Sequence, residues 1–333
     1  MKKLLIIIFI LCITFLSAED TIIDSLKKQL KTASQTEKID ILNELSYYHL
    51  DDSPEIAIDY AKKALNLAIF LKDQKGQAIS LYYLALTNEN LNKLGIALNY
   101  YLELLEIQKK IAIKENIADT QHSIGIVFDN LSNYNMALEF YQKSRETYKE
   151  LNDSLGVAFV LNNIGNTYES LGQYDTALEY QLDALRIYES GSINDKDGIA
   201  TTLNNIGNIY QSLGGFGKAL NFFRRTLNIY HELNDKYGLS IAYNNLGMIH
   251  HDLKNYDKAL DFYKKSLELD KELKDPYGSA GSYNNIAMIY EDLNQSEKAE
   301  EYYLQSLKIS EDINDKYSIA NTNNNIGHYY IKQ

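Results

Sequence analysis

The chain has 333 residues, a net charge of −12 and 45% hydrophobic residues, so it is long and apolar enough to bury a sizeable core. An acidic surface repels phosphate backbones, and no basic stripe offsets it, so we expect no nucleic-acid partner. Proline is scarce and no alternating strand pattern is found, which predicts an all-α fold.

Residues 1–18 are predicted to form a secretory signal peptide. Two lysines precede a 13-residue apolar run from Leu4 to Leu16, and the small residue Ala18 follows. The run is shorter than the roughly 20 residues that span a bilayer. Leu16 lies where a small residue is usual before cleavage, so an uncleaved anchor is the alternative.

Cleavage after residue 18 would remove Lys2 and Lys3 and change the net charge from −12 to −14. It would also remove Cys12, the only cysteine, which excludes disulfides and thiol chemistry from the mature chain. Leu11 precedes Cys12 where a lipoprotein signal needs a small residue, so we do not expect lipid attachment. No later segment is apolar enough to cross a membrane.

The phrase Asn-Asn-Ile-Gly recurs along the chain. Its last position falls at intervals of 40, 42, 40, 40 and 40 residues, at Gly125, Gly165, Gly207, Gly247, Ala287 and Gly327. A constant period in this range predicts a solenoid, in which stacked copies bury a core that no single copy could bury.

One copy illustrates the unit. Asp153 is a good N-cap, apolar residues then follow at 3.6-residue spacing, and Gly172 ends this helix. A second apolar stripe runs over residues 174–188, so each copy is predicted to be an antiparallel helix pair. Small residues let the two backbones approach closely: Gly125, Gly165, Gly207 and Gly247 on the first helices, and Ala137, Ala177, Ala219, Ala259 and Ala299 on the second.

The alanine series extends the solenoid over residues 36–333, as seven helix pairs and the first helix of an eighth. Residues 19–35 form a leading amphipathic helix and linker, and two inserted residues within 190–196 should bulge one connection. In the last helix Ile326 and Tyr330 are expected to lack their packing partners. Either this helix is itself the cap, or the sequence is a truncated product with repeats and an effector missing.

These residues resemble the tetratricopeptide repeat family. Its pattern matches Ile164, Gly165, Tyr168, Tyr174, Ala177 and Ala184. The resemblance implies a right-handed superhelical α-solenoid. Gln181 departs from the pattern by replacing a later aromatic residue, the family's Trp and terminal Pro are absent, and the period is 40 instead of 34. Such long repeats are similar to those of Pins-type polarity scaffolds and of many bacterial signalling proteins.

In this family the first helices line a groove through three positions, which lie three before, one after and four after the glycine. Here these positions are Asn162, Asn166, Glu169, Asn204, Asn208, Gln211, Asn244, Met248, His251, Asn284, Met288 and Glu291. A row of asparagines can donate to and accept from an extended peptide. Alternatively, the asparagines stabilise the stack, a role that suits Asn163, Asn205, Asn245 and Asn285 better.

Few of these positions carry a cation, and Arg224 and Arg225 fall on a second helix. The family's clamp for C-terminal carboxylates is therefore disfavoured. We expect a protein or extended peptide partner that is neutral or basic instead of acidic.

His250-His251-Asp252 is the only candidate metal or acid–base cluster. Adjacent histidines on a helix diverge by about 100°, and His250 lies at a core position, so we expect no metal site. No phosphate-binding glycine loop or serine elbow is found. The sequence predicts a scaffold that needs no cofactor and is not an enzyme.

The N-terminal order of segments resembles the extracytoplasmic region of Bacteroidetes-type histidine kinases, nucleotide cyclases and helix-turn-helix regulators. The signal peptide is followed by the segments 24–30, 37–45 and 53–55 and then by the repeats. This resemblance implies a sensor or interaction region in the periplasm or envelope of a Gram-negative bacterium. Membrane contact would come only from a missing C-terminal part or an uncleaved signal. The alternative is a complete, free-standing periplasmic adaptor or assembly scaffold.

Overall fold

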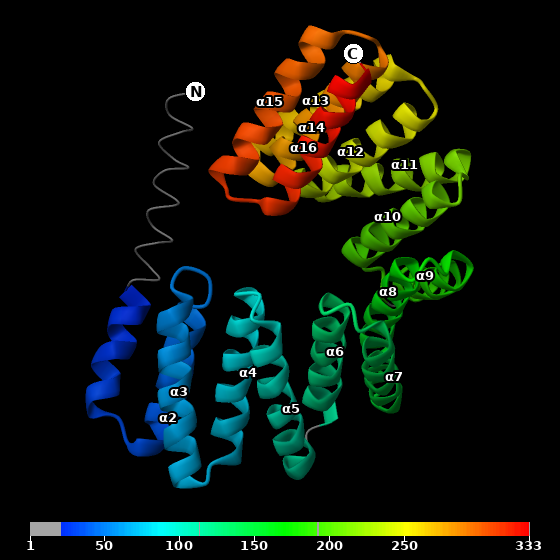
Figure 1. Cartoon of the computed structure of the whole chain (residues 1–333). Coiled ribbons are helices and arrows are strands. Elements are labelled where there is room, and N and C mark those ends of the chain that lie inside the picture. The colour runs from blue at the N-terminus through cyan, green and yellow to red at the C-terminus, as the bar shows by residue number, and fades with distance from the viewer. Residues whose placement is uncertain (1–20, 113, 192, 333) are drawn as a thin grey trace. The chain divides into compact units, whose positions relative to one another are not determined.

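The computed structural model describes residues 21–112, 114–191 and 193–332 (Figure 1). All regular secondary structure in these ranges is helical, which confirms the predicted all-α fold class. The predicted signal peptide, with Cys12, lies outside the described residues. None of the helices within the described ranges is both long and apolar enough to cross a membrane.

The chain divides into two compact units, residues 1–163 and residues 164–333. In the first unit, a helical segment over residues 21–32 precedes three helix pairs. These are α2 (Gln35–Tyr48) with α3 (Pro54–Leu71), α4 (Gln74–Asn90) with α5 (Leu94–Ile111), and α6 (Lys114–Asn130) with α7 (Tyr134–Glu150).

The boundary between the units falls inside α8 (Ser154–Ser170). The second unit continues with α9 (Tyr174–Tyr188), which follows α8. Three further pairs and a last helix follow: α10 (Lys196–Ser212) with α11 (Phe216–Leu233), α12 (Lys236–Asp252) with α13 (Tyr256–Leu273), α14 (Pro276–Asp292) with α15 (Ser296–Asp312), and α16 (Lys316–Lys332).

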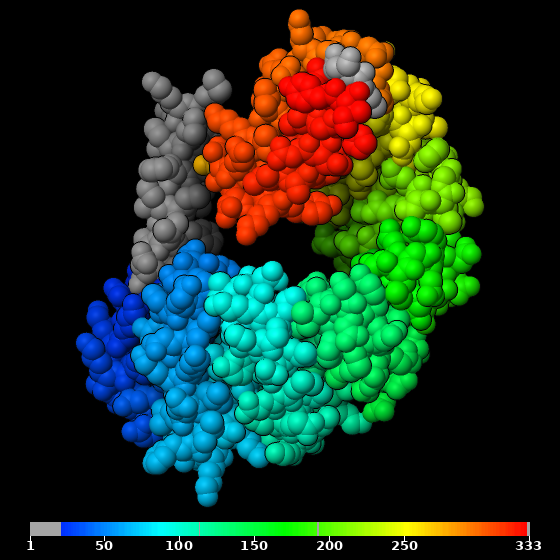
Figure 2. Space-filling view, in the orientation of Figure 1, coloured from blue at the N-terminus to red at the C-terminus, as the bar shows by residue number. Residues whose placement is uncertain are grey.

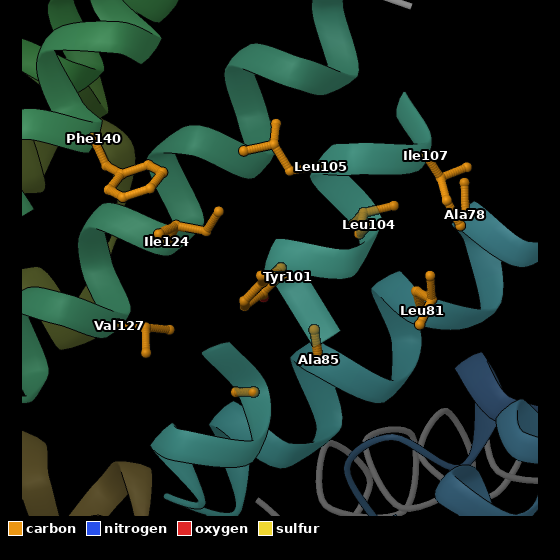
Figure 3. Packing of buried hydrophobic residues seen from close by; sticks show 11 residues of the cluster. Ala78, Leu81, Ala85, Tyr101, Leu104, Leu105, Ile107, Ile124, Val127 and Phe140 are labelled. Carbon is orange, nitrogen blue, oxygen red and sulfur yellow. The ribbon is translucent and has the colours of Figure 1, made fainter. Parts of the chain in front are cut away.

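The first unit shows how neighbouring pairs share a core. Leu81 on α4, Tyr101 and Leu104 on α5, Ile124 on α6 and Phe140 on α7 belong to one buried cluster (Figure 3). In the space-filling view, side chains of successive helices in this unit meet along the visible face (Figure 2). This cluster draws on both the α4–α5 pair and the α6–α7 pair, so neither pair buries its apolar side chains by itself.

The repeated glycine accommodates a ring and not a neighbouring backbone. A Cβ added at Gly207 would lie 2.5 Å from the ring of Phe223, and one at Gly247 would lie 2.6 Å from the ring of Tyr263. The expectation that glycine and alanine bring two backbones together was therefore wrong for the glycine. Its missing side chain is the space that a fully buried aromatic residue of the second helix fills.

A second series of glycines joins each pair to the next. Gly198 and Gly238 lie near the starts of α10 and α12, where an added Cβ would overlap the rings of Tyr188 and Tyr230 from the preceding pair. Aromatic rings packed against bare helix backbone thus occur both within pairs and between them.

Helix ends follow ordinary capping chemistry. The Gly156 amide donates to the Asp153 carboxylate at 3.0 Å, as the N-cap prediction requires. Gly172 ends α8 with φ +71°, in the left-handed region. The inserted residues at 190–196 fall in the connection between α9 and α10.

The last helix, α16, packs on the preceding pair. Ile326 joins the cluster formed by α13, α14 and α15, so the expectation that it lacks a partner was wrong. Tyr329 is buried, and its hydroxyl donates to the Ser296 carbonyl at 3.0 Å. Tyr330 is 55% exposed, but its hydroxyl donates to the Glu300 carboxylate on α15 at 2.7 Å, so the expectation that it lacks a partner was also wrong.

Candidate functional site: the inter-repeat amide row

The predicted groove residues lie on the first helices of successive pairs. Asn162 belongs to the first unit and is buried, so the site is described from the second unit, on α8, α10, α12 and α14. There Asn284 is buried, and the other predicted positions are partly exposed.

A row of side-chain amide hydrogen bonds connects these helices. The Nδ2 atom of Asn245 donates to Oδ1 of Asn204 at 2.6 Å, and Asn285 donates in the same way to Asn244 at 2.8 Å. Asn325 on α16 continues the row by donating to Asn284 at 3.0 Å. Both asparagines of the repeated Asn-Asn pair therefore take part in the stack.

This row fixes which way the groove amides face. Because Oδ1 of Asn204 and of Asn244 accepts from the next repeat, each Nδ2 group is held on the other side of its amide. Within the described residues, neither Nδ2 has a hydrogen-bond acceptor, and Asn208 has no hydrogen-bond partner for its side chain. The stack thus leaves donors of defined orientation on a partly exposed face.

Asn166 carries a modified form of the contact. Its Oδ1 accepts from Asn205 at 3.0 Å and from Nε2 of Gln181 at 2.7 Å. Gln181 is the residue that stands in place of the usual ring, and it packs beside Gly165. The departure from the repeat pattern therefore converts a ring contact into an additional amide contact.

A second row of polar contacts lies one helical turn further on. Gln211 donates to Asp252 at 2.7 Å, and Nε2 of His251 lies 2.8 Å from the Asp292 carboxylate. Glu291 accepts from the hydroxyl of Tyr303 at 2.9 Å. Burial raises the pKa of Glu169, which lies at the equivalent position on α8. Gln211, His251 and Glu291 thus also connect neighbouring helices.

The two adjacent histidines do not converge. His250 is buried and stacks on Phe262, with ring centroids 5.4 Å apart, and burial lowers its pKa. His251 instead contacts Asp292 and the ring of Tyr256. In the described part of the chain, no group of three metal-binding side chains is close enough to hold an ion.

The first unit uses histidine in the equivalent row. His122 lies three residues before Gly125, and its Nε2 lies 2.6 Å from Nδ2 of Asn163. Burial lowers the pKa of His122 to about 4, so the imidazole is neutral and can accept the amide proton. The row therefore tolerates either an amide oxygen or an imidazole nitrogen as acceptor.

The sequence analysis missed one feature of the second unit, a cavity of about 240 Å³ beside Asp270, which Asn244 and Asn285 also line. Asp270 is 2% exposed. An alignment of the copies would have revealed this unusual junction, because Asp270 stands where the three preceding copies carry Tyr148, Tyr188 and Tyr230.

Repeated helix pairs joined by buried rings and polar rows define a helical-repeat scaffold. Models of the tetratricopeptide repeat match residues 116–190, 198–272 and 280–313, which together make up more than half of the chain. The chain belongs to the tetratricopeptide repeat family. A search of curated protein sequences found no significant match.

Solved structures share this fold. The apo form of the quorum sensor NprR from B. thuringiensis is 19% identical, with a TM-score of 0.73 over 90% of this chain and 84% of that one. The apo form of RapI is 19% identical, with a TM-score of 0.68 over 83% and 98%. A Rap protein complexed with Competence and Sporulation Factor is 17% identical, with a TM-score of 0.61 over 86% and 80%.

Proposed function

We propose that this protein is a non-catalytic scaffold whose first helices bind an extended peptide or protein segment. The observation that carries the proposal is the amide row, which orients the Nδ2 groups of Asn204 and Asn244 toward the partly exposed face. Two donors repeated along a solenoid suit the repeated carbonyl groups of an extended main chain. The complex of a Rap protein with Competence and Sporulation Factor and the quorum sensor NprR support a binding role for this fold.

The partner is neutral or basic. The full chain carries a net charge of −12, and none of the twelve groove positions is a lysine or arginine. Glu169 and Glu291 add carboxylates to the same helices, and burial raises the pKa of Glu169. An acidic segment would therefore be repelled, whereas a basic one would be attracted.

The protein acts in the envelope of a Gram-negative bacterium, as the sensor region of a signalling protein. This part of the proposal depends on the predicted signal peptide at residues 1–18 and on the resemblance of the 40-residue repeats to Bacteroidetes-type signalling proteins. The alternative is a free-standing periplasmic adaptor, and the signal segment alone supports it equally. Genomic sequence that continues past Gln333 into an apolar segment of about 20 residues and an effector domain would favour the first role.

The groove is tested by removing the donors while keeping the stack. Asn204→Asp together with Asn244→Asp retains an oxygen that accepts from Asn245 and Asn285 but removes both free Nδ2 groups. The control, Asn221→Asp with Asn228→Asp, makes the same chemical change at exposed positions on α11.

Peptides selected from a random library on the full-length protein serve as probes, and fluorescence anisotropy gives their affinities. We expect the groove variant to bind at least roughly tenfold more weakly than the control, the effect of losing about 1.4 kcal/mol. Equal affinities of the two variants, with unchanged helical circular dichroism, would contradict the groove assignment.

A further inference from the structure

The junction between α13 and α14 departs from the pattern of the preceding junctions. At the α11–α12 junction, Tyr230 packs against Gly238 and against Ala200 and Ala242. At the α13–α14 junction, Asp270 takes the place of the tyrosine and its carboxyl group packs against Gly278. The smaller side chain leaves the cavity of about 240 Å³ unfilled.

The surroundings of Asp270 change together with it. Ser240 and Ser282 occupy the positions of Ala200 and Ala242, so two methyl groups become two hydroxyl groups. The Ser282 hydroxyl donates to Oδ2 of Asp270 at 2.9 Å, and the Ser240 hydroxyl bonds to Oδ1. A hydroxyl group at the Ser282 position also occurs in other copies, as Ser80, Thr120, Thr202 and Thr322, but Ser240 stands where all the other copies carry alanine. Asp270 and Ser240 are therefore two coordinated differences at one junction, and with Ser282 they form a site built around a carboxylate.

Hydrogen bonding in this cluster consumes donors and leaves acceptors. The hydroxyl protons of Ser240 and Ser282 are directed to the carboxylate, and Ser266 donates to the Ser240 carbonyl at 3.0 Å. Asp275, the N-cap of α14, also lines the cavity, and its Oδ1 accepts from two backbone amides. A ligand at Asp270 therefore meets oxygen lone pairs and negative charge, so it must itself supply hydrogen-bond donors and positive charge.

No lysine, arginine or histidine lines the cavity within the described ranges. Burying a carboxylate without a cation is unfavourable, and accordingly burial raises the pKa of Asp270. An entering cation would compensate for that burial.

Two exposed tyrosines belong to the lining of the cavity. Tyr237 and Tyr277 line the cavity and are 58% and 60% exposed. Aromatic faces attract organic cations within about 6 Å, and this contact does not suit a strongly hydrated metal ion. Gly281 on the same wall has no atom within 4 Å of an added Cβ, so the wall is open there.

We propose that the cavity between α12, α13 and α14 binds a primary ammonium group, such as a lysine side chain, through Asp270, Ser240 and Ser282. Asn244 lines both this cavity and the groove, so the same bound segment reaches both. That the ammonium group belongs to a peptide rests on the proposed function, but the preference of the cavity for an ammonium group does not.

The test uses the full chain and two small probes, Nα-acetyl-lysine N-methylamide and its norleucine analogue, which has a similar apolar stem and no charge. Isothermal titration and saturation-transfer NMR measure binding. We expect the lysine probe to bind and the norleucine probe to bind at least roughly tenfold more weakly, the difference expected for a charge-assisted hydrogen bond.

Two matched substitutions on α13 locate the effect. Asp270→Asn should weaken binding of the lysine probe at least roughly tenfold, whereas Asp257→Asn, which removes the same charge from an exposed position, should leave it unchanged within about twofold. Asp270→Tyr should abolish binding by refilling the cavity as in the preceding copies, and circular dichroism verifies that it folds.

Several results would overturn the assignment. These are no binding of the lysine probe, equal binding of the norleucine probe, and an equal loss in Asp257→Asn. If magnesium or calcium chloride displaces the lysine probe when the metal ion is present at a lower concentration than the probe, the cavity is an inorganic cation site instead. If Asn204→Asp weakens the binding of library peptides while the lysine probe does not bind, only the cavity proposal fails. If the lysine probe binds but Asn204→Asp leaves the affinity of library peptides unchanged, only the groove proposal fails.

Discussion

The α11–α12 junction and the α13–α14 junction share one backbone frame but differ in what fills it. At the first, the ring of Tyr230 lies against Gly238 in an apolar cluster. At the second, a buried carboxylate and hydroxyl groups border a cavity. A stacked repeat can therefore lose apolar packing at one junction without changing its helices. The position that stabilises one junction is then available for binding at another.

The largest effect is expected when a carboxylate replaces the ring at the α11–α12 junction. Tyr230→Asp removes a buried ring, and Ala200 and Ala242 offer no hydroxyl groups to the new carboxylate. We expect the free energy of unfolding to fall by about 3–5 kcal/mol, as for other buried aromatic truncations. Urea denaturation followed by circular dichroism measures this. A loss below about 1 kcal/mol would show that the ring does not hold the junction together.

The glycine that receives the ring gives the next largest effect. Gly238→Val would force the Tyr230 ring out of its position, and overpacking of this kind typically destabilises by about 1–3 kcal/mol. Gly281→Ala is the control, because its Cβ would enter open space and should stabilise the helix by about 0.5–1 kcal/mol. Effects of the same sign in the two variants would contradict the assigned roles of these glycines.

The reverse transfer should stabilise the protein. Asp270→Tyr fills the cavity and is expected to raise stability at pH 7 by about 0.5–2 kcal/mol. Burial raises the pKa of Asp270, with a smaller contribution from the neighbouring charge of Asp275. The folded state therefore binds the proton more tightly than the unfolded state, and stability falls as pH rises through the raised pKa.

Asp270→Asn isolates that electrostatic contribution. The variant should be more stable than the natural protein at pH 7, and the difference should shrink as pH falls through the raised pKa toward the ordinary aspartate value of 3.8 and stay small below it. Thermal melts at a series of pH values measure the difference. A difference that stays constant with pH would mean that the carboxylate carries no burial penalty.

Exposed ion pairs between neighbouring repeats should matter least. Lys236 and Glu272 lie 2.5 Å apart, and their side chains are 51% and 56% exposed. Lys236→Met should lower stability by less than about 1 kcal/mol, and 1 M salt should remove the effect. A loss of stability above about 1 kcal/mol that persists in 1 M salt would contradict the minor role expected for this exposed pair.

The sequence predicted the helices well because the information is local and repeated. The recurring glycine, the capping aspartates and the apolar spacing each act within one helix or one pair. It did not predict that the glycine receives a ring, because spacing alone does not tell which side chain of the second helix crosses above Gly207 or Gly247. Nor could it choose between the two roles of the asparagines.

That choice depends on geometry between repeats. The amide of Asn204 accepts from a residue 41 positions away, and only this contact shows that one side chain can both hold the stack and present a donor. The Asp270 cavity was within reach of sequence comparison between copies, since the tyrosine of the three preceding copies changes to aspartate while the alanine at the position of Ser240 changes to serine. Its volume and the direction of the serine hydroxyl groups toward the carboxylate could be found only from the packed structure.

A crystal structure of the full-length protein with a library-selected, lysine-containing peptide tests the central claim most directly. Recognition by the first helices predicts main-chain carbonyl groups at hydrogen-bond distance from Nδ2 of Asn204 and Asn244, and the lysine ammonium group beside Asp270. A peptide bound on the second helices, or one that leaves those amides and the carboxylate untouched, would contradict it.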